Sequence, residues 1–88
     1  MEAGLSKVQV KYRGHLAALT GVPEESLQAA NIKGILKNLR KCHGRETEKA
    51  ARSMIIALNG ENILLLQRYK TVLLDGDEVS FFPICAGG

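Results

Sequence analysis

The sequence of 88 residues predicts an α+β fold in which a mixed β-sheet is combined with one main helix. Three observations lead to this prediction. Apolar and polar residues alternate over residues 5–13, the pattern of a half-buried strand. Apolar residues recur at helical spacing between residues 32 and 39. An apolar run over residues 54–58 is followed directly by Asn59-Gly60, a dipeptide typical of tight β-hairpins.

The first predicted strand is expected to lead through a turn into a second one. Residues 14–23 are interpreted as a turn-rich connection because they end in Gly21-Val22-Pro23, which interrupts regular structure. Residues 24–30 are then expected to form a short strand. The two strands together would make a hairpin.

The main helix is expected to begin after Asn31, because its side chain can accept a hydrogen bond from the first helical turn. The apolar stripe of this helix consists of Ile32, Ile35, Leu36 and Leu39. Gly44 is expected to stop or kink the helix. Residues 45–53 also favour helix, and they either extend the main helix or form an extra turn after it.

The remainder of the chain is expected to complete the sheet. A short strand is predicted over residues 62–65, after the hairpin, and an irregular connection over residues 67–74. Asp75-Gly76-Asp77 indicates a turn, and its two carboxylates are expected to shape that turn rather than to act as acid and base. Residues 78–82 form the last predicted strand, which Pro83 ends.

Length and composition exclude several classes of protein. A chain this short has room for one modest core and none for a large enclosed active site, so we do not expect an independent enzyme. No stretch approaches the ~18 apolar residues that span a bilayer. The N-terminal residues lack the features of a signal peptide, so we expect a cytoplasmic protein with Cys42 and Cys85 as free thiols.

The formal net charge of +3 is concentrated in the helical region. Against Glu46 and Glu48, residues 33–52 contain seven basic residues: Lys33, Lys37, Arg40, Lys41, Arg45, Lys49 and Arg52. Three interpretations stay open: a solvated face with pairs such as Glu48–Arg52, a docking surface for an acidic partner, and a nucleic-acid surface. The helical region contains no aromatic residue, which argues against nucleic acid.

A metal site is not expected. The candidate ligands are Cys42 and His43, with His15 and Cys85 elsewhere in the chain, and adjacent side chains on a helix diverge by about 100°. Cys42 is instead expected to pack near the helix end, and His43 to complement the helix dipole.

The C-terminal glycines point to a function rather than to folding. Gly87 and Gly88 follow the last strand closely, and glycine loses more entropy on ordering than any other residue. A chain without Cβ atoms is thin enough to enter a narrow channel, where it would present the Gly88 carboxylate to another enzyme.

Several motifs resemble the MoaD/ThiS family of ubiquitin-like sulfur carriers, above all the molybdopterin synthase small subunit. The resemblance is sharpest in Leu73-Leu74-Asp75-Gly76-Asp77-Glu78-Val79-Ser80-Phe81-Phe82-Pro83 followed by Ala86-Gly87-Gly88. The Asn59-Gly60-Glu61 turn also matches, as does the opening strand from Val8 to Tyr12. The resemblance implies a β-grasp fold, with a single domain over residues 1–83 and a flexible tail over residues 84–88.

The resemblance also implies a mechanism. An adenylating enzyme would use ATP and magnesium to activate the Gly88 carboxylate, and a sulfur donor protein would then convert it to a thiocarboxylate, with Gly87 beside it in the channel. The loaded carrier would give its sulfur to cofactor biosynthesis, most directly to a large molybdopterin synthase subunit. The chain itself would bind no cofactor.

Partner contacts are expected around the tail. One of Phe81 and Phe82 should face the core and the other should face outward, because strand residues alternate. The residues expected to contact partners are Phe82, Pro83, Ile84, Cys85 and Ala86. Ile84 stands where many molybdopterin-type members have a second proline. Cys85 is interpreted either as a small apolar contact or as a thiol close to the activated terminus.

Three alternatives remain beside the molybdopterin carrier. A carrier for the thiamine pathway would use the same chemistry. A ubiquitin-like modifier would be conjugated through Gly88 to lysines of other proteins. A non-catalytic binding module would tolerate deletion of Gly87 and Gly88.

Overall fold

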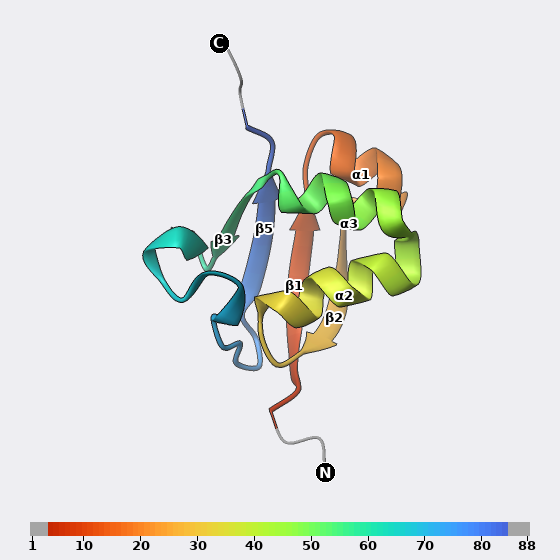
Figure 1. Ribbon diagram of the computed structural model, residues 1–88. Coiled ribbons are helices and arrows are strands. Elements are labelled where there is room, and N and C mark those ends of the chain that lie inside the picture. The colour runs from red at the N-terminus through yellow and green to blue at the C-terminus, as the bar shows by residue number, and fades with distance from the viewer. Residues whose placement is uncertain (1–3, 85–88) are drawn as a thin grey trace.

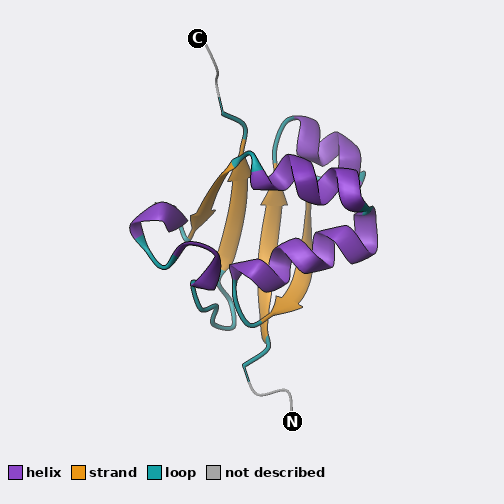
Figure 2. Cartoon of the chain, in the orientation of Figure 1, coloured by secondary structure: helices purple, strands orange, loops and turns teal. Residues whose placement is uncertain are grey.

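The computed structural model describes residues 4–84, which form a five-stranded mixed sheet with helices packed against it (Figure 1, Figure 2). The strands are β1 (Ser6–Tyr12), β2 (Glu24–Ala29), β3 (Ile55–Leu58), β4 (Glu61–Asn62) and β5 (Glu78–Phe82). Their order across the sheet is β2-β1-β5-β3-β4. β5 runs parallel to β1 and antiparallel to β3, so the last strand lies inside the sheet. This arrangement confirms the predicted β-grasp fold.

Helices cover one face of the sheet, with α2 and α3 lying across it (Figure 2). The α-helices are α1 (His15–Thr20), α2 (Ile32–His43) and α3 (Arg45–Arg52). Two short 3₁₀ helices, η1 (Ile63–Leu65) and η2 (Arg68–Lys70), follow β4. None of the helices in residues 4–84 has the length and apolar character needed to cross a membrane.

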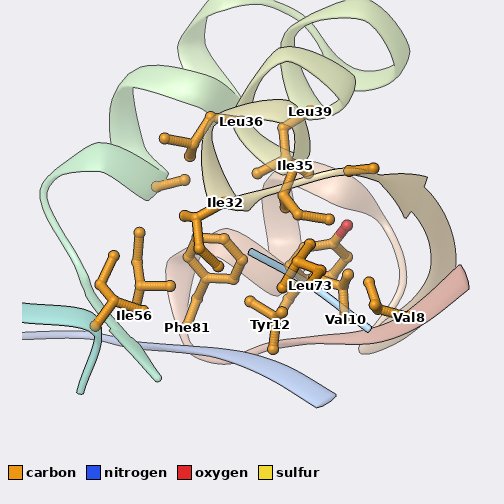
Figure 3. Close-up of a cluster of buried hydrophobic side chains, with 14 of the residues drawn as sticks. Val8, Val10, Tyr12, Ile32, Ile35, Leu36, Leu39, Ile56, Leu73 and Phe81 are labelled. Atoms are coloured by element: carbon orange, nitrogen blue, oxygen red, sulfur yellow. The ribbon is translucent and has the colours of Figure 1, made fainter. Parts of the chain in front are cut away.

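The core lies between the sheet and α2 (Figure 3). The apolar stripe of α2 is fully buried, as the helical spacing predicts, and it meets alternate residues of β1 and β5. The central aromatic side chain is Phe81, which is 0% exposed. Burying a large apolar side chain of this kind contributes about 1.5–3 kcal/mol relative to leaving it exposed.

The predicted limits of the main helix are confirmed. Asn31 Oδ1 accepts a hydrogen bond of 2.9 Å from the Gly34 N–H and caps the first turn. Gly44 follows the last residue of α2 with a φ of 101°, a conformation that L side chains rarely adopt. This break makes residues 45–52 a separate helix rather than an extension of α2 or a single turn.

Two expectations about local structure are wrong. Residues 15–20 form α1 within the stretch predicted as turns, and its inner side buries Leu16 completely. The strand expected over residues 62–65 ends at Asn62, because the Asn62 side chain accepts a hydrogen bond of 2.9 Å from the Leu64 N–H and starts η1.

The Asp75–Asp77 turn has the predicted structural role. Asp75 Oδ1 accepts a hydrogen bond of 2.8 Å from the Lys7 N–H, and Asp77 Oδ2 accepts one of 2.8 Å from the Leu74 N–H. These bonds fix the entry of the chain into β5.

Candidate functional site

The candidate site is the end of β5, where the chain leaves the sheet (Figure 1). β5 is hydrogen-bonded on both sides, to β1 and to β3, so its last residues are held firmly in place. Ile84 is the final residue that the structure describes. The other predicted site residues, Cys85, Ala86, Gly87 and Gly88, lie outside the described residues, as does most of the predicted tail.

The two phenylalanines of β5 point to opposite faces, as predicted. Phe81 is buried in the core, whereas Phe82 lies on the outer face of the sheet with 36% of its surface exposed. The Arg13 guanidinium carbon lies 5.4 Å from the centroid of the Phe82 ring, within the range of a cation–π interaction. Ile55 of β3 is directly opposite Phe82 in the strand register and is 40% exposed.

These exposed side chains form a patch around the start of the tail. We call it the tail-root patch and define it as Arg13, Ile55, Phe82, Pro83 and Ile84. Exposed aromatic and aliphatic side chains beside one arginine are the composition that protein interfaces favour. The patch contains no nucleophile and no carboxylate, so its chemistry suits binding rather than bond making.

Two members of the tail-root patch, Arg13 and Ile55, were not predicted from the sequence as site residues. Ile55 falls within the apolar run over residues 54–58, whose unbroken apolar character predicts a buried strand, and Arg13 is the last residue of the first predicted strand. Period-two alternation in β3 could have placed Ile55 on the outer face, but its pairing with Phe82 depends on the register between β3 and β5.

The candidate metal ligands do not come together. Cys42 is exposed, so the expectation that it packs near the helix end is wrong. His43 lies in the last turn of α2, as the dipole argument expects, and its Nε2 lies 2.7 Å from Glu25 Oε2. Residues 4–84 contain no group of three or more His, Cys, Asp or Glu side chains arranged to hold a metal ion.

Glu25 also binds a buried tyrosine. The Tyr12 hydroxyl donates a hydrogen bond of 2.5 Å to Glu25 Oε2, while Tyr12 is only 3% exposed. Burial raises the pKa of Tyr12 well above its ordinary value, and the Glu25 carboxylate raises it further. This contact joins β1, β2 and the end of α2, and it lies outside the tail-root patch.

The basic residues of α2 and α3 are largely solvated. The predicted pair is present, with Arg52 Nη2 donating to Glu48 Oε2 at 3.0 Å. Within the described part of the chain, six others are exposed and form no ion pair: Lys33, Lys37, Arg40, Lys41, Arg45 and Lys49. Their exposure agrees with a solvated face and leaves the two binding interpretations open.

Comparison with known proteins identifies a family that this chain matches. The ThiS family model matches residues 10–88. The solution structure of small archaeal modifier protein 1 from Methanosarcina acetivorans is 26% identical, with a TM-score of 0.84 over 96% of this chain and 98% of that one. A putative molybdopterin converting factor subunit 1 from Pyrococcus furiosus is 29% identical, with a TM-score of 0.73 over 89% of this chain and 97% of that one.

A further solved structure shares the fold. It is the complex of subunits 1 and 2 of molybdopterin-converting factor from Helicobacter pylori, matched at 24% identity and a TM-score of 0.68 over 93% of this chain and 99% of that one. No curated protein matches the sequence. Because the family model covers nearly the whole chain, the chain belongs to the ThiS family of ubiquitin-like sulfur carriers, small proteins that carry sulfur rather than catalyse reactions.

Proposed function

We propose that this chain carries sulfur as a thiocarboxylate on Gly88 and donates it in the biosynthesis of molybdopterin. The observation that carries the proposal is that the match to the ThiS family extends through Gly87 and Gly88. The likeness to the Pyrococcus furiosus protein, at 29% identity, supports molybdopterin as the destination.

The activating step belongs to a partner enzyme that binds ATP and magnesium. A carboxylate oxygen of Gly88 attacks the α-phosphorus of ATP, pyrophosphate leaves, and an acyl-adenylate forms. A sulfide nucleophile from a donor protein then attacks the carbonyl carbon. The C–S bond forms as AMP leaves, because AMP is a far better leaving group than the oxygen of a free carboxylate.

The chain contributes position rather than catalysis. β5 anchors the root of the tail, and the tail-root patch offers the partner an apolar surface next to it. The four residues after Ile84 span at most about 14 Å when fully extended. Deleting Gly88 would withdraw the carboxylate by about 3.3–3.6 Å, and a misplacement of only ~1 Å at a reacting centre can cost ~100-fold in rate.

The experiment is a loading assay. The purified chain is incubated with its adenylating partner, ATP, magnesium and a sulfide source. The product is trapped with a thiol-reactive alkylating agent, and the label is located by fragmentation mass spectrometry. We expect the label on Gly88.

Two variants make the result decisive. Cys85→Ser removes the only thiol near the terminus and should keep the label on Gly88, whereas a chain without Gly88 should lose it. If a partner that loads an authentic carrier leaves Gly88 unlabelled, the carrier proposal is wrong.

A second candidate function is protein modification, which the likeness to small archaeal modifier protein 1 favours. It requires the same activation, but a lysine amine of another protein replaces the sulfide as nucleophile. Proteins purified with a tagged chain are digested to test it. A protease that cleaves after alanine cuts at Ala86 and leaves Gly87-Gly88 on the acceptor lysine. Such remnants would favour the modifier over the carrier.

A further inference from the structure

The outer edge of the sheet has an open position beside Ile56. β4 pairs with β3 only at Ala57, opposite Asn62, and at Leu58, opposite Glu61. The next position in this register would place Ile63 opposite Ile56, but Ile63 begins η1. The Ala57–Asn62 pair is of the non-hydrogen-bonded kind, so the Ile56 C=O beside it accepts from the Ile63 N–H, and the ladder stops before the return bond from the Ile56 N–H.

The backbone of Ile56 faces this open edge. Residues of an antiparallel strand direct their peptide groups alternately to the two sides. The Asn59 N–H donates to the Glu78 oxygen at 2.7 Å, so every second residue from Asn59 faces β5, and Ile56 faces the other side. The Ile63 C=O, which would take the return bond, accepts instead from the Leu66 N–H at 2.9 Å. Among residues 4–84 the Ile56 N–H is therefore left without a backbone partner.

A groove of about 550 Å³ lies along this edge. Its walls are mainly apolar and include Met54, Ile63, Leu64 and Tyr69. Two arginines, Arg52 and Arg68, line it as well, and Ile84 is also among its lining residues. β3 and the segment that contains η1 form this side of the molecule (Figure 1). We call this hollow the β3-edge groove.

The two arginines give the groove a positive charge. The Arg52 guanidinium carbon lies 5.5 Å from the Tyr69 ring centroid, which holds the arginine over the groove wall. One of its nitrogens pairs with Glu48, and the remaining donors are available. Arg68 takes part in none of the ion pairs among residues 4–84.

We propose that the β3-edge groove binds an extended acidic segment of a partner protein, which adds to the sheet as a strand beside β3. Three features select this ligand. The open N–H of Ile56 takes a backbone carbonyl of an extended chain. The apolar wall takes alternate aliphatic side chains, and the arginines pair with a carboxylate. A partner held here lies next to Ile84 and so next to the root of the tail, and its binding does not depend on sulfur chemistry.

The test is a titration of the full ¹⁵N-labelled chain with the acetylated and amidated peptide Glu-Val-Thr-Ile-Val-Asp, followed by NMR. We expect the largest shifts at the amides of Ile56 and Leu64, together with slower hydrogen exchange at Ile56. A peptide N-methylated at its central residues tests strand pairing, and one with lysines in place of the acids tests charge. Each control peptide should bind about tenfold more weakly.

Matched variants locate the site on the protein. Leu64 and Leu65 are neighbouring leucines in η1, 63% and 76% exposed, and only Leu64 lines the groove. Leu64→Ala should weaken binding about fivefold while Leu65→Ala leaves it unchanged. Likewise Arg68→Gln should weaken binding, and Lys70→Gln, in the same short helix, should not.

Several outcomes would overturn the proposal. It is wrong if no amide shifts at about 1 mM peptide, if the N-methylated or lysine peptide binds equally well, or if the shifts fall on α2 and α3. It is also wrong if Ile56 is already protected from exchange in the free chain. Loss of that protection on deleting residues 85–88 would identify the chain's own tail as occupant, and loss on dilution would identify a second copy.

Discussion

Glu25 is the residue on which three elements of the structure converge. Its Oε2 atom accepts the hydrogen bond of the Tyr12 hydroxyl from β1 and lies against His43 Nε2 from α2. Tyr12 is buried, and a buried hydroxyl without a partner would cost about 1–3 kcal/mol. Glu25 therefore links the sheet to the end of α2 and gives the buried Tyr12 hydroxyl its hydrogen-bond partner.

The raised pKa of Tyr12 predicts a loss of stability in alkali. The unfolded chain begins to lose the tyrosine proton near its ordinary pKa of 10.0, whereas the folded chain retains it. The contribution of Tyr12 is therefore complete below pH 10 and declines above it, by up to about 1.4 kcal/mol per pH unit. Urea unfolding at pH 7 to 11 should show this decline in the natural sequence and a smaller one in Tyr12→Phe. A Tyr69→Phe control should keep the full decline, and equal slopes in all three proteins would contradict the argument.

Phe82 is predicted to matter for binding more than for folding. Its ring is partly exposed at the tail-root patch, so Phe82→Ala removes contact area from a partner while it leaves the core intact. We expect about tenfold weaker binding to the adenylating enzyme, measured as the carrier concentration for half-maximal ATP–pyrophosphate exchange. Val72→Ala is the matched control, because Val72 is 67% exposed and lies outside the patch. Equal losses in the two variants would show that the patch has no special role.

At the scale of elements, α2 depends on a single cap. Asn31 is the residue that satisfies a free N–H of the first turn, and α2 supplies four fully buried side chains to the core. Asn31→Ala should lower the free energy of unfolding by about 1 kcal/mol, whereas Asn31→Ser should restore most of it. Thermal or urea unfolding measures both, and equal stabilities for the two variants would show that the cap does not act through its side-chain oxygen.

The sequence predicted those elements whose pattern is long or chemically distinctive. The alternation in β1, the stripe of α2 and the Asn59-Gly60 turn all depend on local spacing, and Asn59 and Gly60 take the positive φ values, 51° and 88°, of the tightest hairpin turn. α1 was not predicted because six residues make fewer than two helical turns, too few to show a repeat, and the glycines around it favour turns. The end of β4 was not predicted because it depends on the side chain of Asn62.

At the scale of the whole molecule, the candidate site was only partly visible in the sequence. The outward position of Phe82 follows from the alternation within its own strand. Arg13 and Ile55 join it only because β5 pairs with β1 on one side and with β3 on the other. The β3-edge groove has the same origin, since it exists where a neighbouring strand stops. Both surfaces depend on the register between strands and on where a strand ends. Neither property can be predicted from local sequence patterns, so the surfaces become visible only in the folded sheet.

The two binding surfaces have separate roles in this account. The tail-root patch lies on the outer face of the sheet, whereas the β3-edge groove runs along its edge, and Ile55 and Ile84 belong to both. One part of a partner protein can therefore bind the β3-edge groove while another part of the same partner receives the tail. The anchored β5 supplies the fixed point from which both contacts are made.

The most direct test of the central claim follows the sulfur. The chain is loaded at Gly88 with isotopically labelled sulfur, freed from ATP and its activating partner, and mixed with a large molybdopterin synthase subunit and its pterin substrate. We predict that the labelled sulfur leaves the chain and appears in the pterin product, while Gly88 returns to a carboxylate. Sulfur that stays on Gly88, or a chain that becomes linked to lysines instead, would contradict a sulfur carrier for molybdopterin.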